Sequence, residues 1–284
     1  MGWMVAAGLS FVGFVAAVKS VGPAIPVAEG AFLRFFFGLV LVLPLAGRVR
    51  AHWPSRRDMR LIWLRAAIHA AAISAWYLAM TRIPIAEVTA INYLAPVCVT
   101  LGAALFLGER LALRRLAAIG IAFLGALVLL RPGFRDLGAG QIAMVAAAIC
   151  LGGSYLIAKS LSARLPAVVI VAWLSLSVTP ILLPFALWHW VTPGPRALLL
   201  LILAAGFSTL GHYLMTLAFR AAPVAVTQPV TFLQLVWSVL LGVFVFGEPV
   251  DPFVILGGGI IVAAVSFIAW RESRAGTVAG TPRI

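Results

Sequence analysis

The sequence predicts an all-α membrane protein with ten transmembrane helices arranged as two inverted five-helix repeats. Apolar residues make up 63% of the 284-residue chain and charged residues only 10%, and no soluble domain of this length has enough interior for so many apolar side chains. The apolar residues gather into ten stretches, and the second half of the chain resembles the first. We therefore expect lipid to surround most of this chain.

Each apolar stretch is close to the roughly 20 residues that a helix needs to cross a bilayer. Prolines stand at or near many of the stretch ends, where a missing backbone N–H costs little. The expected helices, in chain order, are 3–18, 28–46, 61–81, 84–107, 114–130, 141–161, 166–188, 196–221, 223–246 and 252–270.

The repeat is seen best in the fourth stretch of each half. Residues 84–109 and 223–248 align without a gap, and seven of the 26 aligned positions are identical. Five helices per half is an odd number, so the second copy is inverted in the membrane, as in many secondary transporters. We expect a first repeat at 1–133, a second at 138–271 and a disordered cytoplasmic tail at 272–284. The shared motif residues that open and close the aligned segments are Pro84, Gly108, Glu109, Pro223, Gly247 and Glu248.

The basic residues predict the orientation. The net charge is +13, but the basic residues lie in short loops between apolar stretches, a pattern typical of membrane topology and not of a nucleic-acid-binding face. With a cytoplasmic N-terminus, fourteen of them fall in inner loops and the C-terminal tail and five in outer loops. We therefore expect a multi-pass protein of the bacterial inner membrane with both termini in the cytoplasm.

Several motifs resemble those of EamA-type drug/metabolite transporters. They are LFLGER at 105–110, the Pro-Ile-Ala-Glu that starts at residue 84, Arg-Pro-Gly at 131–133 and AFLRFFFGLVLVLPL at 31–45. The spacing of Lys19, Arg34 and Arg65 is similar to that in a subgroup that includes riboflavin, S-adenosylmethionine and metallophore carriers. The resemblance covers nearly the whole chain. It implies ten helices, inverted repeats and a central cavity that opens alternately to each side of the membrane.

Charged residues within a bilayer are costly, so each one is a candidate for function. Lys19 ends the first expected helix, and Glu29 and Arg34 lie near the start of the second. Lys19 and Glu29 are expected to pair across the first loop, either as a structural ion pair or as a gate or substrate contact. Arg34 lies deeper, where snorkelling to the headgroups is harder.

The third expected helix has a polar and aromatic stripe. Arg65, His69 and Trp76 lie within about 40° of one another at 100° per residue, so they share one face. We expect this face to border the cavity. For Arg65 the alternative is snorkelling to the headgroups, and for His69 the alternatives are a hydrogen-bonded core residue and a proton relay.

The fourth and ninth expected helices are predicted to form the substrate wall. Glu87 lies in the first turn of the fourth helix, where it either complements the helix dipole or carries a coupling proton. Pro96 removes a backbone hydrogen bond and should break the same helix near mid-membrane. Further candidates on these two helices are Asn92, Tyr93, Thr227, Gln228, Pro229 and Gln234. Trp76, Trp173 and Trp237 are central enough to stack on a flat substrate, with core packing as the alternative.

Residues with a structural interpretation lie at helix ends and at close contacts. Glu109 and Glu248 each follow a glycine at a helix end, which favours a cap or an ion pair in the loop. The glycines at 257–259, Gly120 and Gly125 favour close helix packing, either within one molecule or in a homodimer. The oligomeric state is therefore open between monomer and homodimer.

No sequence motif predicts catalysis, a metal site or a cofactor. We expect a secondary transporter whose partners are the bilayer, a small-molecule substrate and protons as the coupling ion. The candidate substrates are amino acids, carboxylates and flavin-like or nucleoside-like compounds, with export as the expected direction and uptake left open by the subgroup. Two alternatives remain at this point: a flippase for lipids or lipid-linked sugars, and a lipid-modifying enzyme that uses His52 and Asp58.

Overall fold

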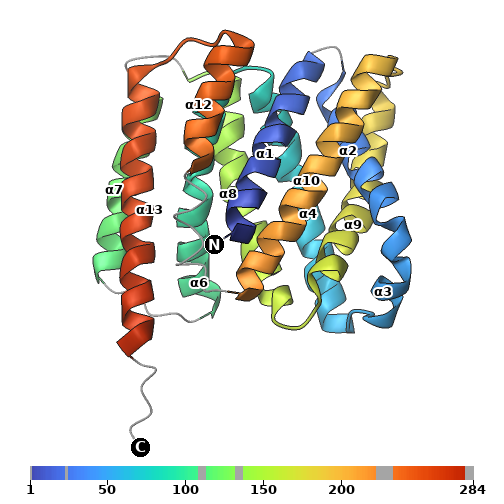
Figure 1. Cartoon of the computed structure of the whole chain (residues 1–284), viewed down its shortest axis with the longest axis horizontal. Helices are drawn as coiled ribbons and strands as arrows, with labels where there is room; N and C mark the ends of the chain where they lie inside the picture. Colours follow the sequence, from blue (N-terminus) through green and yellow to red (C-terminus); the bar gives the residue numbers. More distant parts are fainter. Residues whose placement is uncertain (1, 23–24, 108–112, 132–136, 222–232, 279–284) are drawn as a thin grey trace, which may run out of the picture.

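A computed structural model describes residues 2–22, 25–107, 113–131, 137–221 and 233–278. Within these ranges the regular structure is helical throughout, apart from turns (Figure 1). The helices are α1 (Gly2–Val21), α2 (Val27–Val42), α3 (Ala46–Ala51), α4 (Arg56–Met80), α5 (Ile85–Asn92), α6 (Leu94–Leu107), α7 (Leu113–Leu130), α8 (Ala139–Ser162), α9 (Ala167–Trp188), α10 (Pro195–Ala221), α12 (Leu233–Phe246) and α13 (Pro252–Val278).

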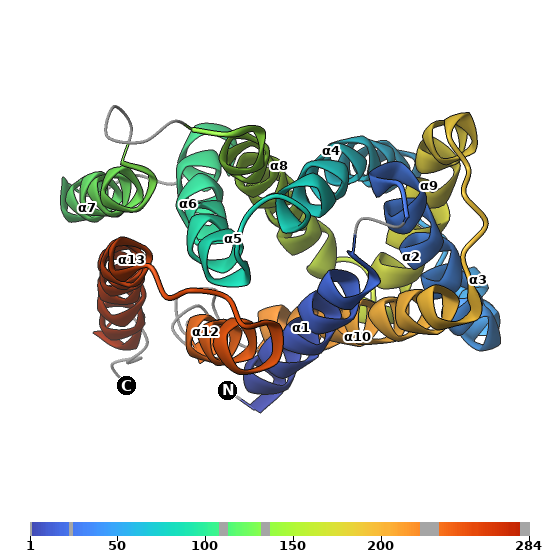
Figure 2. The same ribbon diagram turned by 90° about the horizontal axis from the view of Figure 1, so that it is seen from above.

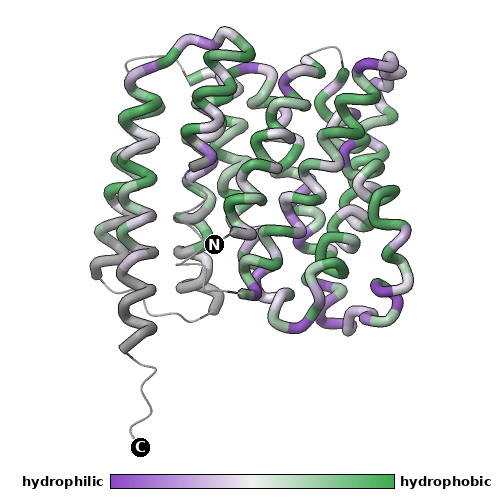
Figure 3. Tube along the Cα trace, in the orientation of Figure 1, coloured by the Kyte–Doolittle hydropathy of each residue, from purple (hydrophilic) through white to green (hydrophobic). Residues whose placement is uncertain are grey.

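The described helices are suited to a lipid environment. Six are long and apolar enough to cross a membrane, and four shorter apolar helices lie at Ile85–Val99, Gly120–Leu130, Val236–Phe246 and Pro252–Ala264. Hydrophobic residues dominate along the helices, and many hydrophilic ones gather near the helix ends (Figure 3). Large apolar side chains such as Phe185 and Phe244 are exposed on the outside of the bundle, which water would penalise and lipid does not. The chain is therefore an all-α, multi-pass membrane protein.

The helix contacts follow the symmetry of an inverted repeat. A 139-residue offset matches α1 with α8, α2 with α9, α4 with α10, and α7 with α13. α1 packs along α10, and α4 packs along α8, so the repeat symmetry maps each of these two contacts onto the other. α2 packs on α9 and α7 packs on α13, so each of these contacts maps onto itself. This is the contact pattern of a pseudo-two-fold axis between the halves (Figures 1 and 2).

The α7–α13 pair stands at one side of the bundle (Figure 2). A Cβ atom on Gly257 would lie 2.5 Å from the carbonyl oxygen of Gly125, and one on Gly125 would lie 2.8 Å from that of Gly257. Only residues without a side chain allow the two backbones to approach so closely. These two glycines therefore serve packing within one molecule.

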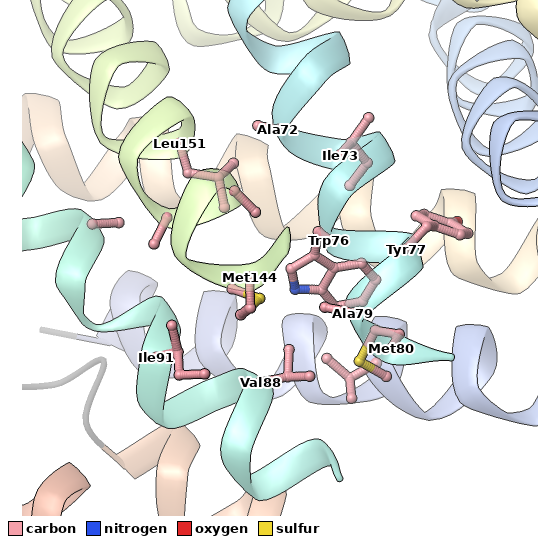
Figure 4. Close-up of a cluster of buried hydrophobic side chains, with 14 of the residues drawn as sticks. Ala72, Ile73, Trp76, Tyr77, Ala79, Met80, Val88, Ile91, Met144 and Leu151 are labelled. Atoms are coloured by element: carbon pink, nitrogen blue, oxygen red, sulfur yellow. The ribbon is translucent and has the colours of Figure 1, made fainter. Parts of the chain in front are cut away.

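The main core fills the space between α4, α5 and α8 (Figure 4). The side chains labelled there are apolar except for the indole nitrogen of Trp76 and the hydroxyl of Tyr77, and all are less than a tenth exposed. This core holds in place the helices that carry the candidate site residues. Its labelled members include Ile73, Trp76, Tyr77, Met80, Val88, Ile91, Met144 and Leu151.

Helix boundaries differ from the expected ones where polar residues continue a helix. α4 begins at Arg56, before the apolar stretch, because the Ser55 hydroxyl caps it by accepting from the backbone N–H of Asp58 at 3.1 Å. α13 continues to Val278, beyond residue 272, where we expected a disordered tail. The break predicted from Pro96 is confirmed, since α5 ends at Asn92 and α6 begins at Leu94.

Candidate functional site

A cavity lies between α1, α2, α4, α5, α6, α8, α10 and α12. It reaches from the middle of the bundle toward the end at which α1 begins, where Met4 and Phe219 border it. This is the lower end of the bundle in Figure 1. Of the candidates predicted from sequence, the cavity brings together Arg34, His69, Trp76, Asn92, Tyr93 and Gln234.

Arg34 of α2 is the positive charge of this cavity. It is buried, with its Cζ atom 3.7 Å from the centre of the Phe35 ring and 5.8 Å from that of Phe14. Its Nε donates to the hydroxyl of Ser208 on α10 at 2.8 Å. No acidic side chain among the described residues pairs with it. The guanidinium is stabilised by aromatic faces and a hydroxyl, so its charge is left uncompensated beside the cavity.

Two histidines from opposite halves meet next to Arg34. His69 of α4 and His212 of α10 have ring centres 5.6 Å apart, and the rings lie edge to face. Nδ1 of His69 is 2.9 Å from the hydroxyl oxygen of Ser154, and Nδ1 of His212 is 2.8 Å from the carbonyl oxygen of Ser208. The inverted repeat thus places one imidazole from each half at the same point of the cavity.

Arg65 is buried beneath this pair and does not snorkel. Its Nε donates to the Ser154 hydroxyl and its Nη1 to the carbonyl oxygen of Ile170, both at 3.4 Å. The headgroup alternative is wrong in this structure, because only 3% of Arg65 is exposed. Arg65 contacts Ser154, which in turn contacts His69, but Arg65 is not among the residues that line this cavity.

An aromatic wall borders the polar groups. The Trp76 indole stacks on the Phe14 ring with centres 4.9 Å apart and an angle of 17° between the planes. Tyr93 and Tyr155 also line the cavity. Trp237, by contrast, lies on the surface of the bundle with 45% of its side chain exposed. Of the three central tryptophans expected either to stack on a substrate or to pack in the core, only Trp76 borders this cavity, whereas Trp173 is buried against Trp53.

The opposite end of the bundle, the upper end in Figure 1, is held by an ion pair between the repeats. Lys19 Nζ at the end of α1 is 2.9 Å from Glu248 Oε1, and Glu248 Oε2 accepts from the backbone N–H of Ile85 at 2.8 Å. Lys19 also donates to the carbonyl oxygens of Met80 and Ile83. These contacts join the end of α1, the start of α5 and the turn after α12. We call this group of residues the upper closure.

The expected pairing of Lys19 with Glu29 is therefore wrong. Glu29 is fully buried, and its Oε2 accepts from the backbone N–H of Val191, in the loop between α9 and α10, at 2.9 Å. Lys19 instead forms its ion pair with Glu248 of the other repeat. Glu248 does form an ion pair, but its partner lies on α1 and not in its own loop, and the backbone N–H that it accepts from is at the start of α5.

The remaining predicted residues fall outside the cavity or outside the described residues. Glu87, in the first turn of α5, accepts from the amide of Gln141 on α8 at 3.2 Å. Pro84 is the residue directly before α5 and makes no side-chain cap, and Gly247 follows α12 with a φ of 63°, which favours glycine. The candidates that lie outside the described residues are Gly108, Glu109, Pro223, Thr227, Gln228 and Pro229.

Sequence reasoning missed His212, Ser154, Ser208 and Tyr155. His212 carried a usable signal, because an ionisable residue inside an apolar stretch is rare and usually faces the interior. The two serines carried none, since a serine in a membrane helix commonly bonds its own backbone. Both in fact contact cavity residues on other helices.

The alternative site at the lower end does not assemble. Asp58 bonds Ser55 and forms an ion pair with Arg164 at 2.8 Å, while His52 contacts the carbonyl oxygen of Arg48 in its own helical turn. These contacts cap α4 and fix a loop. His52 and Asp58 are thus engaged in separate structural contacts, which weakens the interpretation of a shared catalytic pair.

The two halves of the chain each match a known family model. The model of the EamA-like transporter family matches residues 1–131 and again residues 138–270. The chain belongs to this family. Its all-α fold and ten-helix architecture agree with that membership, and the resemblance inferred from the motifs is confirmed.

Similar proteins include named transporters and a solved structure. A riboflavin transporter of Rhizobium johnstonii is 33% identical over 96% of this chain and 91% of its own length. An S-adenosylmethionine uptake transporter of Rickettsia prowazekii is 25% identical over 90% of this chain and 87% of its own. A solved structure described as "Crystal structure of protein" has a TM-score of 0.67 at 18% identity, covering 96% of this chain and 98% of that one. The names support a transporter of a small metabolite, and the solved structure supports the fold.

Proposed function

We propose that this protein is a secondary carrier for a flat, heteroaromatic metabolite of the flavin type, working by alternating access in the bacterial inner membrane. The observation that carries the proposal is the composition of the cavity. The cavity is lined by the stacked pair of Trp76 and Phe14 and by the polar side chains of Arg34, His69 and His212. A flat ring system with polar edges fits such a site, because its faces stack and its edges form hydrogen bonds.

The relatives' names favour flavins among the candidate substrates. The riboflavin transporter is more similar to this chain than the S-adenosylmethionine transporter is, at 33% against 25% identity. Amino acids and simple carboxylates would use Arg34 but leave the aromatic wall without a stacking partner. We therefore rank flavin-like compounds first.

Alternating access is supported by the contrast between the two ends of the bundle. The upper closure joins the repeats with an ion pair, whereas the cavity extends toward the lower end. In an inverted repeat, a rocking motion of one half against the other exchanges the open and closed ends. We propose that the lower end is the cytoplasmic one, in line with the distribution of basic residues, and that export is the net direction.

Protons are the proposed coupling ion, with Glu87 as the proposed carrier. Glu87 is 4% exposed and lies at the helix start that the upper closure also holds, two residues after Ile85. A proton that binds there would act on the same end of α5 as Lys19 and Glu248. Glu87→Gln should abolish the dependence of transport on a pH gradient, and wild-type pH dependence in this variant would contradict the coupling role.

A thermal-shift screen of the purified protein tests the substrate class, because a ligand that binds the folded state raises the apparent stability. The compounds are riboflavin, nucleosides, amino acids, dicarboxylates and short-chain lipids. The proposal expects the largest shift with riboflavin, by about 2.7 kcal/mol at a hundredfold excess over Kd. A shift confined to amino acids would overturn the flavin proposal, and one confined to lipids would favour the flippase.

A further inference from the structure

The hydrogen-bond partner of His212 determines its tautomer. Its Nδ1 lies 2.8 Å from the carbonyl oxygen of Ser208, and a carbonyl oxygen only accepts. In the neutral ring Nδ1 therefore carries the hydrogen, and Nε2 carries a lone pair. The 3.4 Å approach of Arg34 Nη2 to the same Nδ1 is then a contact between two donors and not a hydrogen bond.

His69 has the opposite tautomer. Its Nδ1 lies 2.9 Å from the Ser154 hydroxyl oxygen, which also accepts from Arg65. Ser154 is fully buried, so its hydroxyl hydrogen needs an acceptor, and among the described residues Nδ1 of His69 is the one within reach. Nδ1 of His69 thus accepts, and its Nε2 carries the hydrogen.

The two rings together present one donor and one acceptor. The Nε2 atoms of both histidines are buried and have no hydrogen-bond partner in the described part of the chain. His69 is 1% exposed and His212 is 6% exposed, yet both line the cavity. A buried polar atom without a partner is costly, which indicates that a bound molecule supplies the missing hydrogen bonds.

We propose that His69 and His212 are the specificity-determining pair of the cavity and recognise the cyclic amide edge of a heteroaromatic ring. His69 Nε2–H donates to the ring carbonyl, and His212 Nε2 accepts from the adjacent ring N–H. The pyrimidine part of a flavin has such an edge, with an N–H between two carbonyl groups. This inference rests on the proposed function and specifies which edge of the substrate's ring the two histidines bind.

The surroundings of the pair fit this assignment. The stacked rings of Trp76 and Phe14 line the same cavity, and a free ring face there would hold a flat ring by stacking. Asn92, whose Oδ1 also has no partner in the described part of the chain, lines the cavity as a further acceptor. The edge-to-face contacts of His69 with Phe35 and of His212 with Phe11 hold the two imidazoles in place.

The test compares riboflavin with 3-methylriboflavin, in which a methyl group replaces the hydrogen of the ring N–H. Binding to the purified protein is measured by quenching of flavin fluorescence. We expect 3-methylriboflavin to bind at least about tenfold more weakly, the factor that corresponds to one lost hydrogen bond of about 1.4 kcal/mol. Equal affinity for the two compounds would overturn the inference while leaving the proposed function intact, and this comparison needs no variant.

Variants then assign the roles within the pair. In His212→Leu the preference for riboflavin over 3-methylriboflavin should disappear, because the acceptor is gone. In His69→Leu riboflavin should bind more weakly but the preference should remain. His189→Leu, an exposed histidine at the end of α9, is the matched control and should change neither affinity nor preference.

The outcomes separate the two proposals. Full retention of the preference in a folded His212→Leu protein would contradict the assigned acceptor. If wild-type protein binds neither flavin, the proposed function fails and the inference fails with it. If it binds riboflavin and discriminates against the methyl compound, both stand.

Discussion

Replacing Glu248 with glutamine should open the upper end of the bundle without unfolding the protein. The carboxylate pairs with Lys19 at 2.9 Å and accepts from the backbone N–H of Ile85 at 2.8 Å. Glutamine keeps an acceptor for Ile85 and loses the charge that Lys19 needs. The side chains of Lys19 and Glu248 are 22% and 12% exposed, so the pair lies between a surface ion pair and a fully buried one.

The expected magnitude follows from that position. Exposed pairs contribute about 0–1 kcal/mol, and breaking a fully buried pair costs about 3–5 kcal/mol. If breaking the ion pair of the upper closure costs about 1.4 kcal/mol, the population of molecules with an open upper end rises about tenfold. The assay is the rate at which a membrane-impermeant maleimide, added from the Lys19 side, labels Val88→Cys in the cavity wall of a variant that lacks the two native cysteines.

The control is Asp251→Asn, which breaks an ion pair with Arg131 between α7 and α13, away from the cavity. It should leave the labelling rate unchanged. Equal labelling rates in the wild type and in Glu248→Gln would show that the ion pair does not hold this end closed.

Three further predictions concern packing, binding and capping. Gly257→Ala should lower the melting temperature in detergent, because overpacking costs about 1–3 kcal/mol of stability. Gly259→Ala should leave the melting temperature unchanged, because its added Cβ meets no atom within 4 Å. Equal effects of the two substitutions would contradict the close contact of α7 and α13. Trp76→Ala should weaken riboflavin binding by about two- to tenfold, as the loss of an aromatic contact of about 0.5–1.5 kcal/mol implies, and fluorescence titration should show no change for the exposed Trp237→Ala. Ser55→Ala should cost about 1 kcal/mol of stability through loss of the α4 cap and leave transport rates unaltered, and a transport defect in the folded variant would link this loop to function.

Sequence reasoning was most successful where the signal is local. The shared face of Arg65, His69 and Trp76 follows from the helical period alone, and all three are buried. The helix break near Asn92 follows from the missing N–H of Pro96. The order of apolar stretches likewise predicted the repeats, because hydropathy and helix number require no long-range contact.

Partners across the two repeats could not be predicted in this way. Lys19 was assigned to Glu29 because the two are close in the chain, yet its acid is Glu248 in the other half. The same holds for His69, whose neighbour His212 lies on a helix of the second repeat. Contacts between repeats depend on how the halves pack, and no spacing within one helix specifies that.

The measurement that tests the central claim most directly is counterflow of labelled riboflavin in proteoliposomes loaded with unlabelled riboflavin. It detects a carrier whatever its net direction or coupling ion. We expect a transient accumulation of label that depends on the protein, is lost in Arg34→Gln and is reduced in His212→Leu. Entry of label no faster than into protein-free liposomes, with folded protein present, would contradict it.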